Sequence, residues 1–155
     1  KILIKIYMKN QYLIFKLGKE SYALNIANVR EVIEYIEPEK VPNSEKHILG
    51  MLSIRNEIIA LMDSKVILNS ETKINKETSK IVIFEQSDSH IGIAVDSVSE
   101  VVEIEESEIS PSPHLEMNDT SNSYVKGVVT KNDKLIIVID SSKTKLNVNE
   151  EVVNG

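Results

Sequence analysis

Short apolar runs separated by polar turns recur along this chain at the spacing that β-strands require. Residues 12–17, 21–26, 81–85 and 91–95 are rich in β-branched and aromatic side chains, and polar segments such as Gly18-Lys19 separate them. Runs of this length and composition are typical of strands. Because only a few residues join each run to the next, the pattern predicts two hairpins.

Two further strands and one helix are expected around these hairpins. Valine, isoleucine and glutamate interleave at residues 98–104 and again at 29–36, where the pattern favours a strand after one helical turn. Ser44 as N-cap, a run at 45–49 and Gly50 at the C-terminal stop predict one short helix.

An internal repeat organises these elements. A shift of 69 residues lays residues 12–42 over residues 81–111 with nine identities, where about two are expected by chance for average composition. A shift of 77 residues lays residues 50–63 over residues 127–140, and both segments run from a glycine through a polar turn to an aspartate. The chain therefore contains two copies of one structural unit.

The second block of each copy carries a tight polar turn between two apolar runs. Arg55-Asn56-Glu57 and Asn132-Asp133-Lys134 occupy equivalent places, and Asn and Asp tolerate the positive φ of short hairpin turns. Two copies of about five short strands favour an all-β fold of two five-stranded β-barrels, since closure removes exposed sheet edges. A barrel of about 65 residues has a marginal core alone, so we expect a shared hydrophobic core.

The repeat also suggests the domain bounds. Residues 12–63 and 81–140 are expected to form one domain over residues 10–147, with the strands of the two barrels either separate or interlaced. The chain does not begin with methionine, so residues 1–9 are interpreted as a natural extension or a remnant of cloning, and residues 148–155 as a C-terminal tail.

Composition and charge remove several classes of function. The 155 residues carry 18 Lys and Arg against 24 Asp and Glu, for a net charge of −6, and contain no cysteine. A negative chain repels the phosphate backbone of nucleic acids, and the lack of thiols excludes disulfides, thiolate metal sites and cysteine nucleophiles. No apolar run approaches the ~18 residues that cross a bilayer, so we expect a cytoplasmic protein.

Familiar catalytic motifs are missing from the sequence. His47, His90 and His114 have no metal-binding spacing and are expected at the surface, and no glycine-rich phosphate loop or nucleophile elbow is present. Asp63 and Asp140 each close an apolar strand and are interpreted as turn formers; a small hydrolase or metal enzyme that uses this acidic pair is the alternative function. No cofactor and no metal ion is predicted.

One cation stands apart from the other charged residues. The glutamates along residues 31–39 and 100–108 are expected on a solvated strand face, whereas Arg55 lies at a tight turn between apolar strands. An exposed arginine in a fixed loop is a good interface anchor. A solvated cation without a partner has equal weight on the sequence alone.

In this order and spacing, the motifs resemble the CheW-like chemotaxis coupling proteins. The similar stretches are YLIFKLGKESYALNIANVREVIE at 12–34, VPNSEKHILGMLSIRNEIIALMD at 41–63, IVIFEQ at 81–86, IGIAVDSVSEVVEI at 91–104 and YVKGVV at 124–129. Around the first turn, the family pattern Asn-Leu-Arg-Gly followed by a proline reads Ser53-Ile54-Arg55-Asn56 with Ala60. The arginine matches, and Ser53, Asn56 and Ala60 depart from the pattern.

The resemblance implies two SH3-like five-stranded β-barrels on a shared hydrophobic core, with one or two short helices. It also implies a noncatalytic adaptor that couples chemoreceptors to the chemotaxis histidine kinase in membrane-associated arrays. The expected partners are the cytoplasmic tip of a chemoreceptor, a methyl-accepting protein, in the groove between the barrels, and the regulatory domain of the kinase at barrel ends or edges. The candidate protein-binding residues are Val29, Glu31, Gly50, Arg55 and Asn56, with a helix C-cap as the other interpretation of Gly50.

Overall fold

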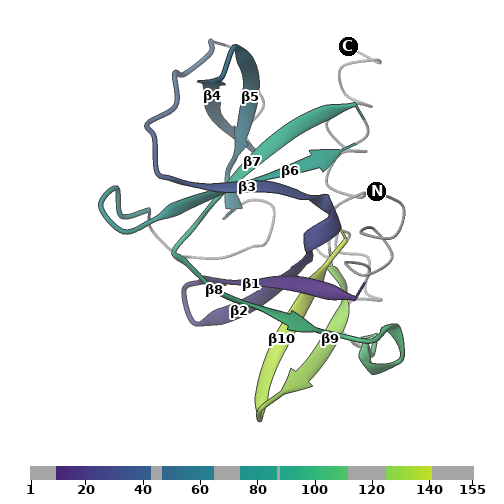
Figure 1. Ribbon diagram of the computed structural model, residues 1–155. Helices are drawn as coiled ribbons and strands as arrows, with labels where there is room; N and C mark the ends of the chain where they lie inside the picture. The colour runs from purple at the N-terminus through teal and green to yellow at the C-terminus, as the bar shows by residue number, and fades with distance from the viewer. Residues whose placement is uncertain (1–9, 43–46, 65–73, 87, 112–124, 141–155) are drawn as a thin grey trace.

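The computed structural model describes residues 10–42, 47–64, 74–86, 88–111 and 125–140. These residues form ten strands in two five-stranded sheets, with two short 3₁₀ helices (Figure 1). The expected extension at residues 1–9 and tail at residues 148–155 lie outside the described residues. The prediction of an all-β fold is confirmed.

Each sheet has the same pattern of pairing. The first has the order β8-β1-β2-β10-β9, with bounds Ser97–Glu103, Gln11–Leu17, Glu20–Asn25, Lys134–Ile139 and Val125–Lys131 in that order. The second has the order β3-β6-β7-β5-β4, with bounds Val29–Glu34, Lys80–Gln86, Ser89–Val95, Glu57–Met62 and Ile48–Ile54. The 3₁₀ helix η1 (Ile26–Asn28) leads into β3, and η2 (Glu106–Glu108) follows β8. The helical turn expected before residue 29 is therefore present.

Both repeat blocks contribute strands to both sheets. Phe15 of β1 lies opposite Val98 of β8, and Phe84 of β6 lies opposite Val29 of β3. The shift of 69 residues relates one pair to the other. Each copy thus gives its last three strands to the sheet that holds the first two strands of the other copy, and Figure 1 shows β3 beside β6 and β8 beside β1.

The chain that follows the third strand of each copy closes the sheet into a barrel. Glu39, after β3, exchanges two backbone hydrogen bonds of 2.8 and 2.9 Å with Met51 of β4 at the opposite edge. Ser110, after β8, exchanges two bonds of 2.8 Å with Val128 of β9. Closure satisfies backbone groups that an open edge would leave unpaired.

Two glycines make this closure possible. A Cβ atom on Gly50 would lie 2.5 Å from the carbonyl oxygen of Glu39, and one on Gly127 would lie 2.6 Å from that of Ser110. Only glycine lets two backbones approach so closely. The pairing also corrects the alignment of the two copies at this point. The shift of 69 residues places Glu39 over Glu108, but the residue that makes the equivalent bridge is Ser110. The turn η2 accounts for the shift of two residues.

The core has three parts, and the largest joins the two barrels. It contains one face of β1, β2, β6 and β7 together with Met62 and Ile139, namely Leu13, Phe15, Leu17, Tyr22, Leu24, Val82, Phe84, Ile91, Ile93 and Val95. The opposite faces of these strands fill the barrel interiors, with Tyr12 and Ile14 in the first and Ile81 and Ile83 in the second. The predicted shared hydrophobic core is confirmed.

The helix expected over residues 45–49 is wrong for the residues of this range that the structure describes, 47–49. Ile48, Leu49 and Gly50 lie in β4, and Ile48 pairs with Met62 of β5. Sheet pairing overrides a local capping pattern because it also buries the apolar side chains. Ser44 and the residues at 45–46 lie outside the described residues. In the described part of the chain, no helix is long and apolar enough to cross a membrane.

The two predicted tight turns are confirmed. Arg55 and Asn56 have φ angles of 49° and 66°, and Asn132 and Asp133 have φ angles of 52° and 65°. Each pair forms a two-residue hairpin loop, between β4 and β5 or between β9 and β10. Two successive positive φ angles define the type I′ turn, which matches the twist of the flanking strands.

The positive φ of Asn56 leads to a stability prediction. We expect Asn56→Val to lower the free energy of unfolding by about 1 to 2 kcal/mol, because a β-branched residue is strained in the left-handed region. Asn56→Gly and Asn56→Asp should be nearly neutral, since glycine tolerates this φ and Asp133 has it in the equivalent turn of the first barrel. Urea denaturation of the three variants checks the prediction; equal losses for valine and glycine would contradict it.

Candidate functional site

An ion pair joins the hairpin turn of the second sheet to β3. Nη2 of Arg55, at the first position of the turn, donates a hydrogen bond to Oε1 of Glu31. The Arg55 side chain is 62% exposed, whereas that of Glu31 is 21% exposed. The structure therefore brings together two of the residues singled out from the sequence, and it keeps most of the arginine accessible.

A β-bulge places a second arginine beside this pair. Val29 lies opposite Phe84 and Glu31 lies opposite Ile83, so Arg30 is an extra residue in β3 with no partner of its own in the ladder. Bulges redirect side chains. The Arg30 side chain lies 3.5 Å from Glu31 Oε2 through its Nε and donates from Nη1 to Oε1 of Glu57, 2.5 Å away.

His90 of β7 completes the cluster. Its Nδ1 lies 2.5 Å from Oε2 of Glu57 and 3.2 Å from Nη1 of Arg30, and its Nε2 lies 3.7 Å from Oε1 of Glu85. Because an ionised carboxylate only accepts hydrogen bonds, His90 is the donor in this contact, through a proton on Nδ1. Both oxygens of Glu57 are therefore held by side chains from other strands.

These contacts shift the titration of the cluster. Hydrogen bonds from Arg30 and then from His90 hold the pKa of Glu57 below its ordinary value of 4.5. The hydrogen bond to Glu57 raises the pKa of Arg30 above its ordinary value, against a smaller opposing effect of burial. A carboxyl whose pKa falls on folding stabilises the folded state above its unfolded pKa, and the contribution disappears as the pH falls through the folded pKa.

We therefore expect acid to abolish the stability difference between the native chain and Glu57→Gln. At pH 7, the native chain should melt at the higher temperature because Glu57 is ionised and paired with Arg30. Below pH 4.5, protonation of Glu57 should bring the two melting temperatures together. Thermal melts from pH 7 to pH 3 check this; a constant difference over that range would contradict it.

The other residues singled out from the sequence have different surroundings. Asn56 is exposed beside Arg55 at the turn. Val29 packs against the shared core, and Gly50 is buried beneath Glu39. Glu31, Arg55 and Asn56 thus gather at one end of the second sheet, while the observed contacts of Val29 and Gly50 are structural.

Sequence reasoning missed Arg30, Glu57 and His90. His90 is expected at the surface, yet its side chain is only 23% exposed and contacts Glu57. Arg30, Glu57 and His90 lie on three different strands, and they come together only when β3, β5 and β7 are placed in one barrel. A comparison of the two copies gives one signal in retrospect. The second copy has Ser99 in place of Arg30 and Lys134 in place of Glu57, so an arginine–glutamate pair at these positions is possible only in the first copy.

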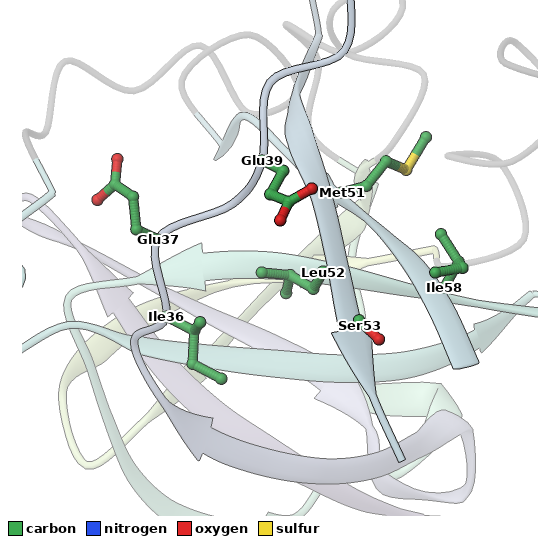
Figure 2. Close-up of a pocket in the computed structure, with 7 residues that line it drawn as sticks. All are labelled: Ile36, Glu37, Glu39, Met51, Leu52, Ser53 and Ile58. Carbon is green, nitrogen blue, oxygen red and sulfur yellow. The ribbon is translucent and has the colours of Figure 1, made fainter. Parts of the chain in front are cut away.

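An apolar pocket of about 260 Å³ lies next to this hairpin. Its lining comes from β4, β5 and the segment after β3, and consists of Ile36, Glu37, Glu39, Met51, Leu52, Ser53 and Ile58. Figure 2 shows Leu52 pointing from β4 toward the segment that carries Ile36 and Glu37. Ile36 and Ile58 are 48% and 67% exposed, so large apolar side chains face solvent at the pocket.

The equivalent edge of the other barrel is covered by ion pairs. Lys131, at the position equivalent to Ile54, pairs with Glu108 of η2 at 2.7 Å. Lys126 of β9 pairs with Glu106 of η2 at 2.9 Å. The two barrels share a backbone plan but differ at this edge: in the second barrel Ile36 and Ile58 are exposed at a pocket, whereas in the first two lysines of β9 pair with glutamates of η2.

The acidic pair considered for hydrolysis is divided between the sheets. Asp63 follows β5 in the second sheet and Asp140 follows β10 in the first. Among the residues that the structure describes, no group of three or more histidine, aspartate and glutamate side chains could hold a metal ion. The geometry thus adds no support to the alternative function.

The described residues thus form a module of two interlaced small barrels that exposes an ion-paired arginine and a pocket beside it. The family model described as CheW-like domain matches residues 11–145. Chemotaxis protein CheW of Klebsiella aerogenes is 26% identical over 133 residues, which cover 86% of this chain and 80% of that protein. Chemotaxis protein CheW of Bacillus subtilis is 28% identical over 131 residues, covering 84% and 83%.

A solved structure is similar as well. The crystal structure of the scaffolding protein TtCheW from Thermoanaerobacter tengcongensis matches with a TM-score of 0.75 and 32% identity, covering 84% of this chain and 88% of that one. The chain belongs to the CheW-like domain family. It is a noncatalytic chemotaxis adaptor, and the comparisons do not support a hydrolase or metal enzyme.

Proposed function

We propose that this chain couples chemoreceptors to the chemotaxis histidine kinase on the cytoplasmic side of the membrane, as a scaffold in receptor arrays. The observation that carries the proposal is the placement of Arg55, which matches the arginine of the family turn and is exposed while Glu31 holds it. The proposed partners are the cytoplasmic tip of a receptor and the regulatory domain of the kinase.

The chemistry of Arg55 suits such a contact. A guanidinium has five N–H donors in a planar fork, and the hydrogen bond from Arg55 to Glu31 is donated by Nη2. A side chain that is already ordered by one carboxylate loses less conformational entropy when a partner binds the remaining donors. The rigid type I′ turn adds to this order because both of its residues, Arg55 and Asn56, have fixed positive φ angles.

The apolar pocket supplies the other ingredient of a protein interface. Interfaces combine an apolar centre with a few anchoring residues, often arginine or aromatic side chains. Ile58 of β5 lines the pocket, and Ser53, which precedes Ile54 and Arg55, lines it as well. The turn and part of the pocket lining therefore belong to one hairpin, so a single partner surface can contact both.

Scaffolding of this kind needs no catalytic group. A change in receptor conformation alters kinase activity only if the contacts through the adaptor differ in free energy between the signalling states. The shared core of the two barrels favours transmission of such a difference, because close-packed side chains resist independent movement.

Direct titration tests the proposal. The purified chain should bind a receptor-tip fragment and the kinase regulatory domain, each in the absence of the other, and the three should form a ternary complex by calorimetry and size-exclusion chromatography. No binding to either fragment would contradict the proposal.

A matched pair of variants tests the surface. Ile58→Ser removes an exposed side chain at the pocket, and Leu135→Ser removes its equivalent in the other barrel, which is 59% exposed. Both should fold normally, because surface substitutions away from special features change stability by about 0.5 kcal/mol or less. Ile58→Ser should weaken binding of at least one partner. A loss with Leu135→Ser alone would move the contact to the first sheet.

A further inference from the structure

We infer that Arg30 is a positioning residue for Arg55: by holding Glu31 and Glu57 together, it ties the hairpin turn between β4 and β5 to β3. The importance of that turn for binding rests on the proposed function. The tie itself rests on the contacts of the three side chains and can be measured in the free protein.

The topology of the sheet creates the need for such a tie. Strands β6 and β7 separate β3 from β5 in the order β3-β6-β7-β5-β4, so no ladder hydrogen bonds join β3 to β5. The backbone bridge that closes this barrel pairs Glu39 with Met51, near the start of β4 and away from the turn at its end. Side chains therefore connect the turn to β3.

Arg30 and Arg55 make that connection in a chain of alternating charge. Glu57 contacts Arg30, Arg30 contacts Glu31, and Glu31 contacts Arg55. Glu57 directly follows the two turn residues Arg55 and Asn56. The hairpin is therefore joined to β3 at two neighbouring points, through Glu57 just after the turn and through Arg55 in the turn. His90 holds the second oxygen of Glu57 and limits the rotation of its carboxylate.

The first barrel shows that the bulge does not require this arrangement. Its equivalent bulge residue is Ser99, which lies between Val98 and Glu100 in the pairing of β8 with β1. The Ser99 hydroxyl donates to the carbonyl oxygen of Ile14 at 3.3 Å, within its own strand pair. An arginine at the bulge of β3 is thus a feature of the barrel that exposes Arg55.

The experiment measures how firmly the turn is held. In the full-length chain without partners, NMR follows hydrogen exchange at the backbone amides of Asn56 and Glu57 and at the Nε–H group of Arg55. Arg30→Gln should speed exchange at these three sites by about three- to fivefold, the effect expected for loss of a partly exposed ion pair. Lys126→Gln breaks an ion pair of the other barrel and should leave all three rates unchanged.

A double variant separates positioning from a general loss of stability. If Arg30 acts through Glu57, Arg30→Gln should add little to the exchange rates of Glu57→Gln. Arg30→Lys should restore them only in part, since an ammonium lacks the planar fork that contacts two carboxylates at once. Unchanged exchange at the turn in Arg30→Gln, or a uniform rise over all strands, would overturn the inference.

Binding provides an independent readout of the consequence. Arg30→Gln should weaken binding of the receptor-tip fragment or the kinase regulatory domain by about three- to fivefold, and should cause no further loss when Arg55 is already alanine. Additive losses would overturn the positioning role, because they would mean that Arg30 acts separately from Arg55. If the native chain binds neither fragment, the proposed function fails and the exchange rates alone decide the role of Arg30.

Discussion

Replacing Arg55 with asparagine should weaken binding to the receptor tip or the kinase regulatory domain by about 30-fold or more, equivalent to about 2 kcal/mol. Asparagine suits the turn, because Asn132 occupies the equivalent position with a φ of 52° against 49° for Arg55. The lost ion pair with Glu31 involves a side chain that is 62% exposed, and exposed pairs contribute about 0 to 1 kcal/mol. The melting temperature should therefore change little.

Two companion variants sharpen this test. Arg55→Ala should lose binding to a similar degree, and Arg55→Lys should recover only part of it if a partner uses the planar guanidinium. Titration calorimetry against both fragments is read beside melting curves of the same samples. If binding per folded molecule is preserved while the melting temperature drops, Arg55 belongs to the fold and not to the interface.

Replacing Phe15 with alanine should lower the free energy of unfolding by about 3 to 5 kcal/mol, the usual cost of removing a buried aromatic side chain. Phe15 is fully buried in the core between the barrels. Its ring stacks on Tyr22, with ring centroids 5.5 Å apart and an angle of 16° between the planes. The cavity would open at the contact of both sheets, so we expect both to lose stability in one transition.

Urea denaturation followed at two probes checks the cooperative loss. Amides of β2 report on the first sheet and amides of β7 on the second, and their midpoints should fall together in Phe15→Ala. Ile58→Ala, at a side chain that is 67% exposed, serves as the control with little expected change. Separate midpoints for the two sheets would show that the core does not couple them.

Most of the architecture was predictable because strands that are buried on both faces have continuous apolar sequences. The run from Tyr12 to Phe15 is apolar without alternation, since successive side chains fill a barrel and the shared core in turn. The repeat then predicted matching hairpins. Over the described residues 47–49 the expected helix was wrong, because a glycine that resembles a helix stop also fits a strand approached by another backbone, as Gly50 shows.

The candidate site was predictable only in part. Hairpin chemistry revealed Arg55 and Asn56, because tight turns have a local signature. The ion pair of Arg55 with Glu31 is not local, since 24 residues separate them. Arg30 was hidden for a different reason: a bulge changes the register of one strand against its neighbour, and the pattern of apolar residues along a single strand does not record that change.

Because each sheet combines the first two strands of one copy with the last three strands of the other, the topology sets the order in which the barrels can close during synthesis. All five strands of the second sheet lie before residue 96, because β7 (Ser89–Val95) is the last of them. The first sheet holds β1 and β2 from the start of the domain, yet it also needs β10, which ends at Ile139. The barrel that contains the Arg55 turn can thus form on the ribosome while β1 and β2 still wait for the last strands of their own sheet.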